Sequence, residues 1–298
     1  MSEEVDISLL VIILDTNPAQ KKLREDTHIL TLCLESIIAL ANSHLMLKAT
    51  NKLAILACHR KSTEFLYPPP QTAAGASTLS MRQIDGQYEL FTQVEKTVRQ
   101  NLQNLVMQDV RNITTESSTE SLLAGAIAMA LCYIHRLEVE LPAGSKMNSR
   151  VLTVTGSADS ASQYMSYMNV FFTAQKQNVT LDVCSLDQDM GLLQQGCDIT
   201  GGLYLRIPQI QGLLQYLLWV FLPEPPIRKK LVLPPPVKVD YRAACFCHRE
   251  LIDIGFVCSV CLSIFCKFSP ICTTCHTVFK SPGPLPIKPR RRKSSSAK

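Results

Sequence analysis

The sequence Ile7-Ser-Leu-Leu-Val-Ile-Ile-Leu14 determines the architecture that we expect for this chain. It is an almost unbroken apolar run with the length of one β-strand, and Asp15 follows it directly. Successive side chains of a strand point to opposite faces, so a continuous apolar run indicates burial on both faces. We therefore predict that residues 7–14 form the central strand of a sheet covered by helices on each side.

Segments of helix and strand type alternate beyond this run. Apolar residues recur at helical spacing in 30–45, 88–110, a segment that starts near Thr119, 161–172, a short segment near Leu192, and 213–221. Strand-like runs occupy 53–58, 65–67, 151–155, 179–184 and 203–207. Parallel strands need crossover connections, which helices provide. The pattern predicts a doubly wound α/β domain with a mostly parallel sheet.

Composition divides the 298-residue chain into four parts. The apolar share of 46% supports a domain of about 200 residues and a smaller module. We expect an α/β domain over 1–222, a semi-rigid linker with six prolines over 223–240, a cysteine-rich module over 241–280 and a basic disordered tail over 281–298. The net charge is +5, but the tail holds six Lys or Arg and no acid, so the remainder is close to −1.

Nothing in the sequence directs the chain to a membrane. The run Leu213–Leu222 is too short to span a bilayer, and the acidic start of the chain differs from a secretory signal. We expect a cytosolic or nuclear protein. The run Lys288-Pro-Arg-Arg-Arg-Lys293 is typical of a nuclear localisation signal, of a weak contact to nucleic-acid phosphate, or of a solvated chain end.

The strongest chemical signal is a cluster of seven cysteines between Cys245 and Cys275. In a reducing compartment such clustering favours a metal over disulfides. Two Cys-x-x-Cys pairs ten residues apart can complete a tetrahedral thiolate shell, for which we choose Cys258, Cys261, Cys272 and Cys275. Four thiolates leave no open position for water, so we expect a structural zinc that stabilises a module with little core.

The remaining ligand-type residues of the cluster allow a second site. These residues are Cys245, Cys247, His248 and Cys266, and their spacing is irregular. The sequence therefore leaves open whether one zinc ion or two are bound. Elsewhere the cysteines lie mostly on apolar faces, where a thiol behaves as a small core residue.

Several motifs resemble one known family. Within the cysteine-rich segment they are Tyr241-Arg-Ala-Ala-Cys-Phe-Cys-His248, Cys258-Ser-Val-Cys-Leu-Ser-Ile-Phe-Cys266 and Ser269-Pro-Ile-Cys-Thr-Thr-Cys275. Upstream they are Leu122-Leu-Ala-Gly-Ala126, Ala130-Leu-Cys-Tyr-Ile-His-Arg136, Leu192-Leu-Gln-Gln-Gly-Cys-Asp-Ile-Thr-Gly-Gly-Leu-Tyr204 and Leu213-Leu-Gln-Tyr-Leu-Leu-Trp-Val-Phe-Leu222. The chain resembles the 34-kDa subunits (Tfb4 family) of the general transcription and DNA repair factor TFIIH over nearly its whole length.

This resemblance implies a fold, a partner and a role. The first domain is expected to have a von Willebrand factor A fold, in agreement with the strand and helix order above. The expected partners are the 44-kDa TFIIH subunit and other subunits of the core complex, with the pair helping to anchor the helicase subunits. The implied role is that of a non-catalytic nuclear subunit in promoter opening by RNA polymerase II and in nucleotide excision repair.

Many von Willebrand factor A domains bind a divalent cation after the first strand, and this chain departs from that ligand pattern. In the expected Asp-x-Ser-x-Ser loop, Asp15 is kept, but Asn17 and Ala19 replace the two serines. Thr119 can serve as the distant threonine, whereas the expected later aspartate is missing and Asp159 lies a few residues away. Magnesium demands near-ideal octahedral oxygen geometry, so we expect no magnesium there.

Two other functions fit the cysteine cluster. A RING-like ubiquitin ligase module uses eight zinc ligands with a central Cys-x-His pair, whereas the Cys-His neighbours here, Cys247 and His248, come near the beginning. A zinc-ribbon DNA-binding factor is opposed by the near-neutral charge outside the tail. The chain has no P-loop, nucleophile elbow or Gly-x-Gly-x-x-Gly motif after a strand, so we do not expect an enzyme.

Overall fold

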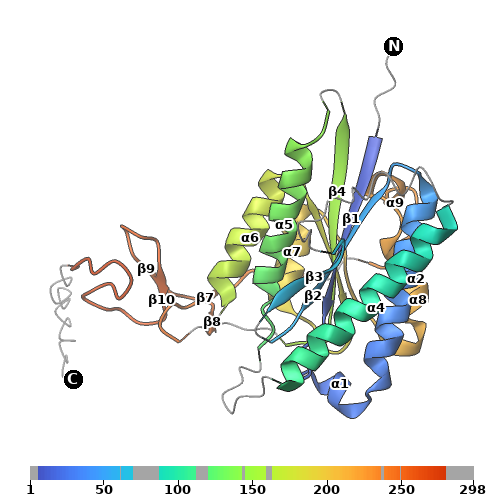
Figure 1. Cartoon of the computed structure of the whole chain (residues 1–298). Coiled ribbons are helices and arrows are strands. Elements are labelled where there is room, and N and C mark those ends of the chain that lie inside the picture. The colour runs from blue at the N-terminus through green and yellow to red at the C-terminus, as the bar shows by residue number, and fades with distance from the viewer. Residues whose placement is uncertain are drawn as a thin grey trace, which may run out of the picture. The chain divides into compact units, whose positions relative to one another are not determined.

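A computed structural model describes residues 6–60, 62–69, 87–111, 120–142, 145–158, 163–235, 238–248 and 250–279. The chain forms two compact units, residues 1–241 and 242–298 (Figure 1). The basic tail falls outside the described residues, so its predicted roles as a nuclear signal or a phosphate contact stay predictions.

A six-stranded sheet with the order β3-β2-β1-β4-β5-β6 organises the first unit. Its strands are β1 (Asp6–Asp15), β2 (Lys52–Cys58), β3 (Thr63–Tyr67), β4 (Lys146–Thr155), β5 (Thr180–Ser185) and β6 (Tyr204–Arg206). Five strands pair in parallel, and only β3 runs antiparallel, at one edge. The predicted central strand is confirmed, because β1 lies between β2 and β4 and Leu9–Leu14 are at most 1% exposed.

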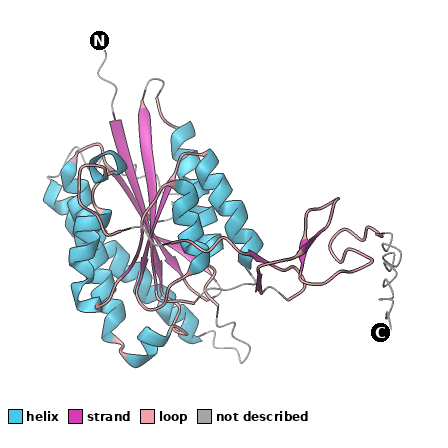
Figure 2. Ribbon diagram, turned by 180° about the vertical axis from the view of Figure 1, so that it is seen from behind, coloured by secondary structure: helices cyan, strands magenta, loops and turns pink. Residues whose placement is uncertain are grey.

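Helices cover both faces of this sheet (Figure 2). Besides α1 (Lys21–Glu25), the principal helices are α2 (His28–Leu47), α4 (Gln87–Arg111), α5 (Leu123–Val139), α6 (Tyr164–Lys176) and α7 (Gly191–Thr200), followed by a final helical segment of η2 (Ile210–Gly212), α8 (Leu213–Tyr216) and η3 (Leu217–Phe221). One apolar core joins α2, α4 and α8 to one face, and a second joins α5, α6 and α7 to the other. Helix α2 is long and apolar enough to span a bilayer, but Ile37, Leu40 and Ala41 are fully buried in the first core, as in a core helix.

Helix α5 begins later than the sequence predicts. Its first residue is Leu123 rather than a residue near Thr119, which itself lies outside the described part of the chain. Just before the helix, the Ser121 hydroxyl donates a hydrogen bond to Asp15, and the Ser121 carbonyl accepts one from Gln163. These contacts hold Ser121 outside the helix, two residues before its first residue, Leu123.

The predicted helix stop at Gly201 and Gly202 is confirmed. Gly201 adopts a left-handed backbone with φ of 69° at the end of α7. A Cβ atom on Gly202 would lie 1.9 Å from the carbonyl oxygen of Leu181, so only glycine fits there. The two glycines turn the chain from α7 into β6 against the neighbouring strand β5.

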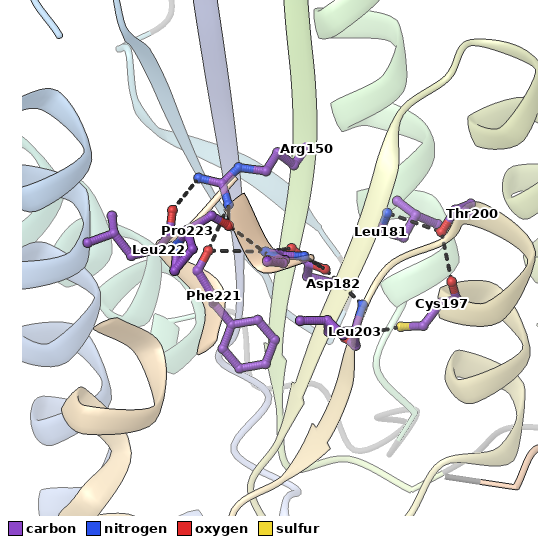
Figure 3. Close-up of polar contacts among 10 residues, drawn as sticks. Arg150, Leu181, Asp182, Cys197, Thr200, Leu203, Phe221, Leu222 and Pro223 are labelled. Atoms are coloured by element: carbon purple, nitrogen blue, oxygen red, sulfur yellow. Dashed lines mark hydrogen bonds and ion pairs between the residues drawn. The ribbon is translucent and has the colours of Figure 1, made fainter. Parts of the chain in front are cut away.

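Two buried arginines hold the end of the final helical segment against the sheet, and Figure 3 shows the contacts of one of them, Arg150. Arg150 on β4 donates hydrogen bonds to the carbonyl oxygens of Phe221, Leu222 and Pro223 at 2.7 to 3.0 Å. The last carbonyls of a helix have no donor within the helix, so a buried helix end needs donors from elsewhere. Arg150 supplies them here, and Arg228 also donates to the carbonyls of Phe221 and Pro223.

Arg228 adds a charge pair to the same place. It is the last residue of the short helix α9 (Pro225–Arg228) and makes two hydrogen bonds, of 2.8 and 2.6 Å, to the two carboxylate oxygens of Asp182 on β5. Both side chains are nearly fully buried, and Asp182 also accepts the backbone N–H of Leu203. A bidentate pair with these extra bonds can offset the desolvation of two buried charges.

The proline-rich segment is attached to the first unit at both of its ends. Composition predicts a semi-rigid linker over 223–240, but Arg228 is buried at one end of this segment. At the other end, Gln195 of α7 donates to the Asp240 carbonyl and the Tyr241 hydroxyl donates to Asp198. Specific polar contacts, which proline content does not reveal, hold this segment on the α/β unit.

We expect Arg228→Ala to lower the free energy of unfolding of the first unit by about 3 to 5 kcal/mol, because it leaves Asp182 as an unpaired buried charge. Arg206→Ala is the matched control, since it breaks an exposed pair with Asp189 and should cost no more than about 1 kcal/mol. Urea unfolding followed by circular dichroism measures both. An equal loss of unfolding free energy in the two variants would show that the buried pair stabilises the fold no more than the exposed pair does.

A buried histidine near Arg150 predicts loss of stability in acid. His44 on α2 is fully buried and donates through Nε2 to the Lys52 carbonyl at 3.2 Å. Burial, reinforced by the positive charge of Arg150, lowers the pKa of His44 to about 4. A histidine that protonates only after unfolding stabilises the fold above the unfolded pKa of about 6.5, and this stability is lost as pH falls towards 4.

The free energy of unfolding should therefore fall by up to about 1.4 kcal/mol for each pH unit across this window because of His44 alone. His44→Gln keeps an amide donor but does not titrate, so its unfolding free energy should vary less steeply with pH. Urea unfolding at several pH values between 7 and 5 tests this. An unchanged slope in the variant would assign the acid sensitivity to other groups.

The second unit has little regular structure. It holds two small antiparallel pairs, β7 (Ala243–Ala244) with β8 (Leu251–Ile252) and β9 (Phe256–Val257) with β10 (Ile264–Phe265). Its buried cluster consists of Cys258, Phe265 and Cys272, with Phe246, Cys261, Cys275 and Phe279 packed around it. So small a core cannot account for the fold by apolar burial alone.

Candidate metal centres

The two Cys-x-x-Cys pairs form two turns of the same construction. In the first, the Cys258 N–H donates to the Ser263 carbonyl, and the N–H groups of Leu262 and Cys261 donate to the carbonyl and the sulfur of Cys258. The second turn repeats all three bonds fourteen residues later, from Cys272 to Thr277, His276 to Cys272 and Cys275 to Cys272. Each turn therefore places two sulfur atoms on one side of a tightly bonded loop.

Both turns contain a non-glycine residue in the left-handed region. Leu262 and His276, which follow the second cysteine of each pair, have φ of 59°. Such residues carry a conformational cost, which persists only where the surrounding structure fixes the backbone. The repetition of this conformation indicates a backbone arranged around the sulfur atoms.

The four sulfurs chosen from sequence lie together. Cys258 Sγ is 3.7 Å from Cys275 Sγ, and Cys261 Sγ is 3.6 Å from Cys272 Sγ. The ligand atoms of all four lie within 4.8 Å of one another. Zinc–sulfur bonds of about 2.3 Å give sulfur–sulfur edges of about 3.8 Å in a regular tetrahedron. The cluster can thus hold a metal ion, and its donor set is consistent with zinc.

Hydroxyl groups beside this cluster favour the thiolate form. Hydrogen bonds from the side chain and backbone of Ser263 lower the pKa of Cys261 to about 6. The equivalent bonds from Thr277 lower the pKa of Cys275. A metal binds the thiolate and not the thiol, so these donors prepare the second sulfur of each turn for coordination.

The other four ligand-type residues also meet in space. Cys245, Cys247, His248 and Cys266 place their ligand atoms within 4.8 Å of one another. The two groups alternate along the chain. Cys258 and Cys261 lie between His248 and Cys266 of this group, and Cys266 lies between the two Cys-x-x-Cys pairs of the other. This interleaving is similar to the cross-brace of RING-like modules, although here the ligands come in runs of three, two, one and two instead of regular pairs.

A separate polar cluster surrounds Asp15 at the carboxyl end of β1. One carboxylate oxygen accepts the Ser121 hydroxyl at 2.9 Å and the Asn17 N–H at 3.2 Å. The other accepts the hydroxyls of Thr155 and Ser157, each at 2.6 Å. Burial raises the pKa of Asp15, and these hydrogen bonds oppose the rise. The carboxylate thus joins the ends of β1 and β4 to the residues before α5.

The described residues of this cluster do not fit a divalent cation. Ala19 has no side-chain oxygen, and Asn17 Oδ1 accepts the Ala19 N–H while its amide nitrogen donates to Ser121. Asp15 is left as a single carboxylate whose oxygens are already hydrogen-bonded, whereas magnesium needs six well-placed oxygens.

Sequence reasoning missed two members of this cluster. Thr119 and Asp159, its proposed contributors, lie outside the described part of the chain, and the structure instead brings Ser121 and Ser157 to Asp15. A usable signal was the position of Ser157, two residues beyond β4, because the carboxyl ends of neighbouring parallel strands meet at one edge of the sheet.

Asp15→Ala should leave magnesium binding unchanged but lower the free energy of unfolding by about 2 to 4 kcal/mol, since three buried hydroxyls lose their acceptor. Calorimetric titration with magnesium and urea unfolding measure the two effects. A magnesium affinity that the variant loses would contradict the structural role of the carboxylate.

The sheet order, the single antiparallel edge strand and the helices on both faces define the first unit as a von Willebrand factor A-type domain, here followed by a small module whose cysteine clusters can hold metal. A family model described as "Transcription factor Tfb4" matches residues 7–276. The chain belongs to this Tfb4 family, as the resemblance in its motifs predicts.

Individual relatives agree with this assignment. The chain is 37% identical over 272 residues to "General transcription and DNA repair factor IIH subunit tfb4" of Schizosaccharomyces pombe, covering 91% of this chain and 89% of the relative. It is 35% identical over 275 residues to the TFB4 subunit of Arabidopsis thaliana, covering 92% and 89%. The crystal structure of the TFIIH p34 N-terminal domain has a TM-score of 0.58 at 29% identity, covering 71% of this chain and 96% of that one.

Proposed function

We propose that the chain is a non-catalytic structural subunit of the TFIIH core complex. It binds the 44-kDa subunit and supports helicase assembly during transcription initiation by RNA polymerase II and nucleotide excision repair in the nucleus. The support for this role is membership of a family whose members are named as subunits of a transcription and DNA repair factor. In this role the protein provides binding surfaces for other subunits and does not catalyse a reaction.

We further propose that Cys258, Cys261, Cys272 and Cys275 bind a structural zinc ion. The two repeated turns and the sulfur separations of 3.6 and 3.7 Å support this assignment. Four thiolates close the zinc shell, so the ion stabilises the second unit and does not activate water. The small buried cluster around Phe265 makes the unit dependent on such a stabilising ion.

The surface of the second unit supports a docking role. Among the described residues of this unit, nine large apolar side chains are exposed: Leu251, Ile254, Phe256, Val257, Val260, Leu262, Phe268, Ile271 and Val278. Only three acidic or basic residues, Glu250, Asp253 and Lys267, occur in 250–279. Depletion of charge together with clustered apolar residues is typical of the buried centre of a protein interface. The composition of 250–279 favours a protein partner for this part of the unit, whereas the tail beyond it is basic.

The first unit also exposes a large aromatic side chain that could contact a partner. Trp219, the single tryptophan of the chain, is 75% exposed on η3, and Ile227 lies exposed a few residues beyond. Tryptophan is enriched among the residues that contribute most to binding energy at interfaces. These side chains are candidates for contact with another subunit.

Co-expression with the 44-kDa TFIIH subunit tests the proposed role. The full chain should co-purify with this partner, and Cys258→Ser should lose zinc, unfold the second unit and recover less partner while the first unit keeps its circular dichroism. Cys132→Ser is the matched control, because Cys132 is an exposed residue of α5 outside the metal clusters. A stable, zinc-loaded monomer that never co-purifies with the 44-kDa subunit would rule out the proposal.

A RING-like ubiquitin ligase is the second candidate, because the two ligand groups interleave along the chain. The early position of Cys247 and His248 in the ligand order and the names of the relatives favour the structural subunit. An autoubiquitination assay with the purified full chain distinguishes the two, since only a ligase would transfer ubiquitin.

A further inference from the structure

The second group of ligand-type residues has the geometry of a metal shell. His248 Nδ1 lies 3.2 Å from Cys266 Sγ and 4.0 Å from Cys245 Sγ, and Cys247 Sγ lies 3.4 Å from Cys266 Sγ. Three thiols and one imidazole within 4.8 Å correspond to the Cys₃His set of structural zinc sites. Sequence spacing named this group as a possible second site and left open whether it binds a metal.

The backbone at Cys245 repeats a feature of the two Cys-x-x-Cys turns. Its N–H donates to the carbonyl of Glu250, five residues later, at 2.9 Å. The same five-residue bond joins Cys258 to Ser263 and Cys272 to Thr277, also at 2.9 Å. Cys245 and His248 have the three-residue spacing of the cysteine pairs in those turns, with histidine as the second ligand.

We infer that Cys245, Cys247, His248 and Cys266 form a second structural zinc site, so that the chain binds two zinc ions in interleaved order. This inference deepens the proposed function and rests on its first zinc site. Binding releases three thiol protons to solvent, and the neutral imidazole coordinates through Nδ1 without losing a proton. Four protein ligands close the shell, so the second ion is also structural.

Interleaving links the two sites mechanically. The segment between His248 and Cys266 carries Cys258 and Cys261 of the first site. In turn, the segment between Cys261 and Cys272 carries Cys266 of the second. Neither site can open fully without displacing a chain segment held by the other. Two ions therefore supply the cross-links that a unit with so small a core lacks.

The number of zinc ions in the reduced full-length chain tests the inference. Native mass spectrometry with elemental analysis should give two per chain, and X-ray absorption at the zinc edge should give seven sulfur ligands and one nitrogen shared between them. One ion with a pure sulfur shell would overturn the second site and leave the first intact. A chain without zinc would overturn both sites.

Substitutions locate the second ion. Cys266→Ser and His248→Ala should each remove at least one zinc per chain, whereas His248→Cys should keep two and change the average shell to sulfur alone. His276→Ala is the matched control, because this histidine follows Cys275 in the same unit but belongs to neither ligand group and should keep both ions. Retention of two zinc ions with unchanged ligands in His248→Ala would refute the site. If the other variants fail to fold, the ligand atoms measured around zinc in His248→Cys still test it, because only a site that contains His248 would exchange nitrogen for sulfur.

Discussion

Strand β1 is buried on both faces, and this burial constrains the rest of the first unit. Residues Leu9–Leu14 are at most 1% exposed, so each side of the strand must be covered by helices and each edge by another strand. An interior of this kind strengthens hydrogen bonds and ion pairs but makes any unpaired polar group costly. Polar side chains around the sheet can therefore persist only where the protein itself provides their partners.

Two carboxylates show how these partners are provided. Asp15 accepts three hydroxyls and a backbone N–H. Asp182 is paired with Arg228, while Arg150 satisfies the helix end beside them (Figure 3). The described residues of the second unit form only a small buried cluster. Its cysteine and histidine side chains could instead stabilise it by binding metal.

The sequence predicts the α/β fold well, because each strand and helix carries its own periodicity. The central run 7–14, the helix stop at Gly201 and the family motifs are all local signals, and the structure and the comparisons confirm the fold and family they indicate. Contacts between distant residues are different, since Ser121 and Ser157 reach Asp15 from 106 and 142 residues away. No local pattern marks such pairs, nor does composition show that a proline-rich segment is attached through Arg228.

The separation between Asp182 and Arg228 along the chain has a consequence for biosynthesis. Arg228 follows Asp182 by 46 residues along the chain, so the acid is synthesised before its cation. Until Arg228 is made, burial of the Asp182 carboxylate would leave its charge without this cation, which is costly. A fragment that ends at residue 222 lacks Arg228 altogether and leaves Asp182 without its buried cation. The α/β unit is thus completed by residues that composition alone would assign to the connection following it.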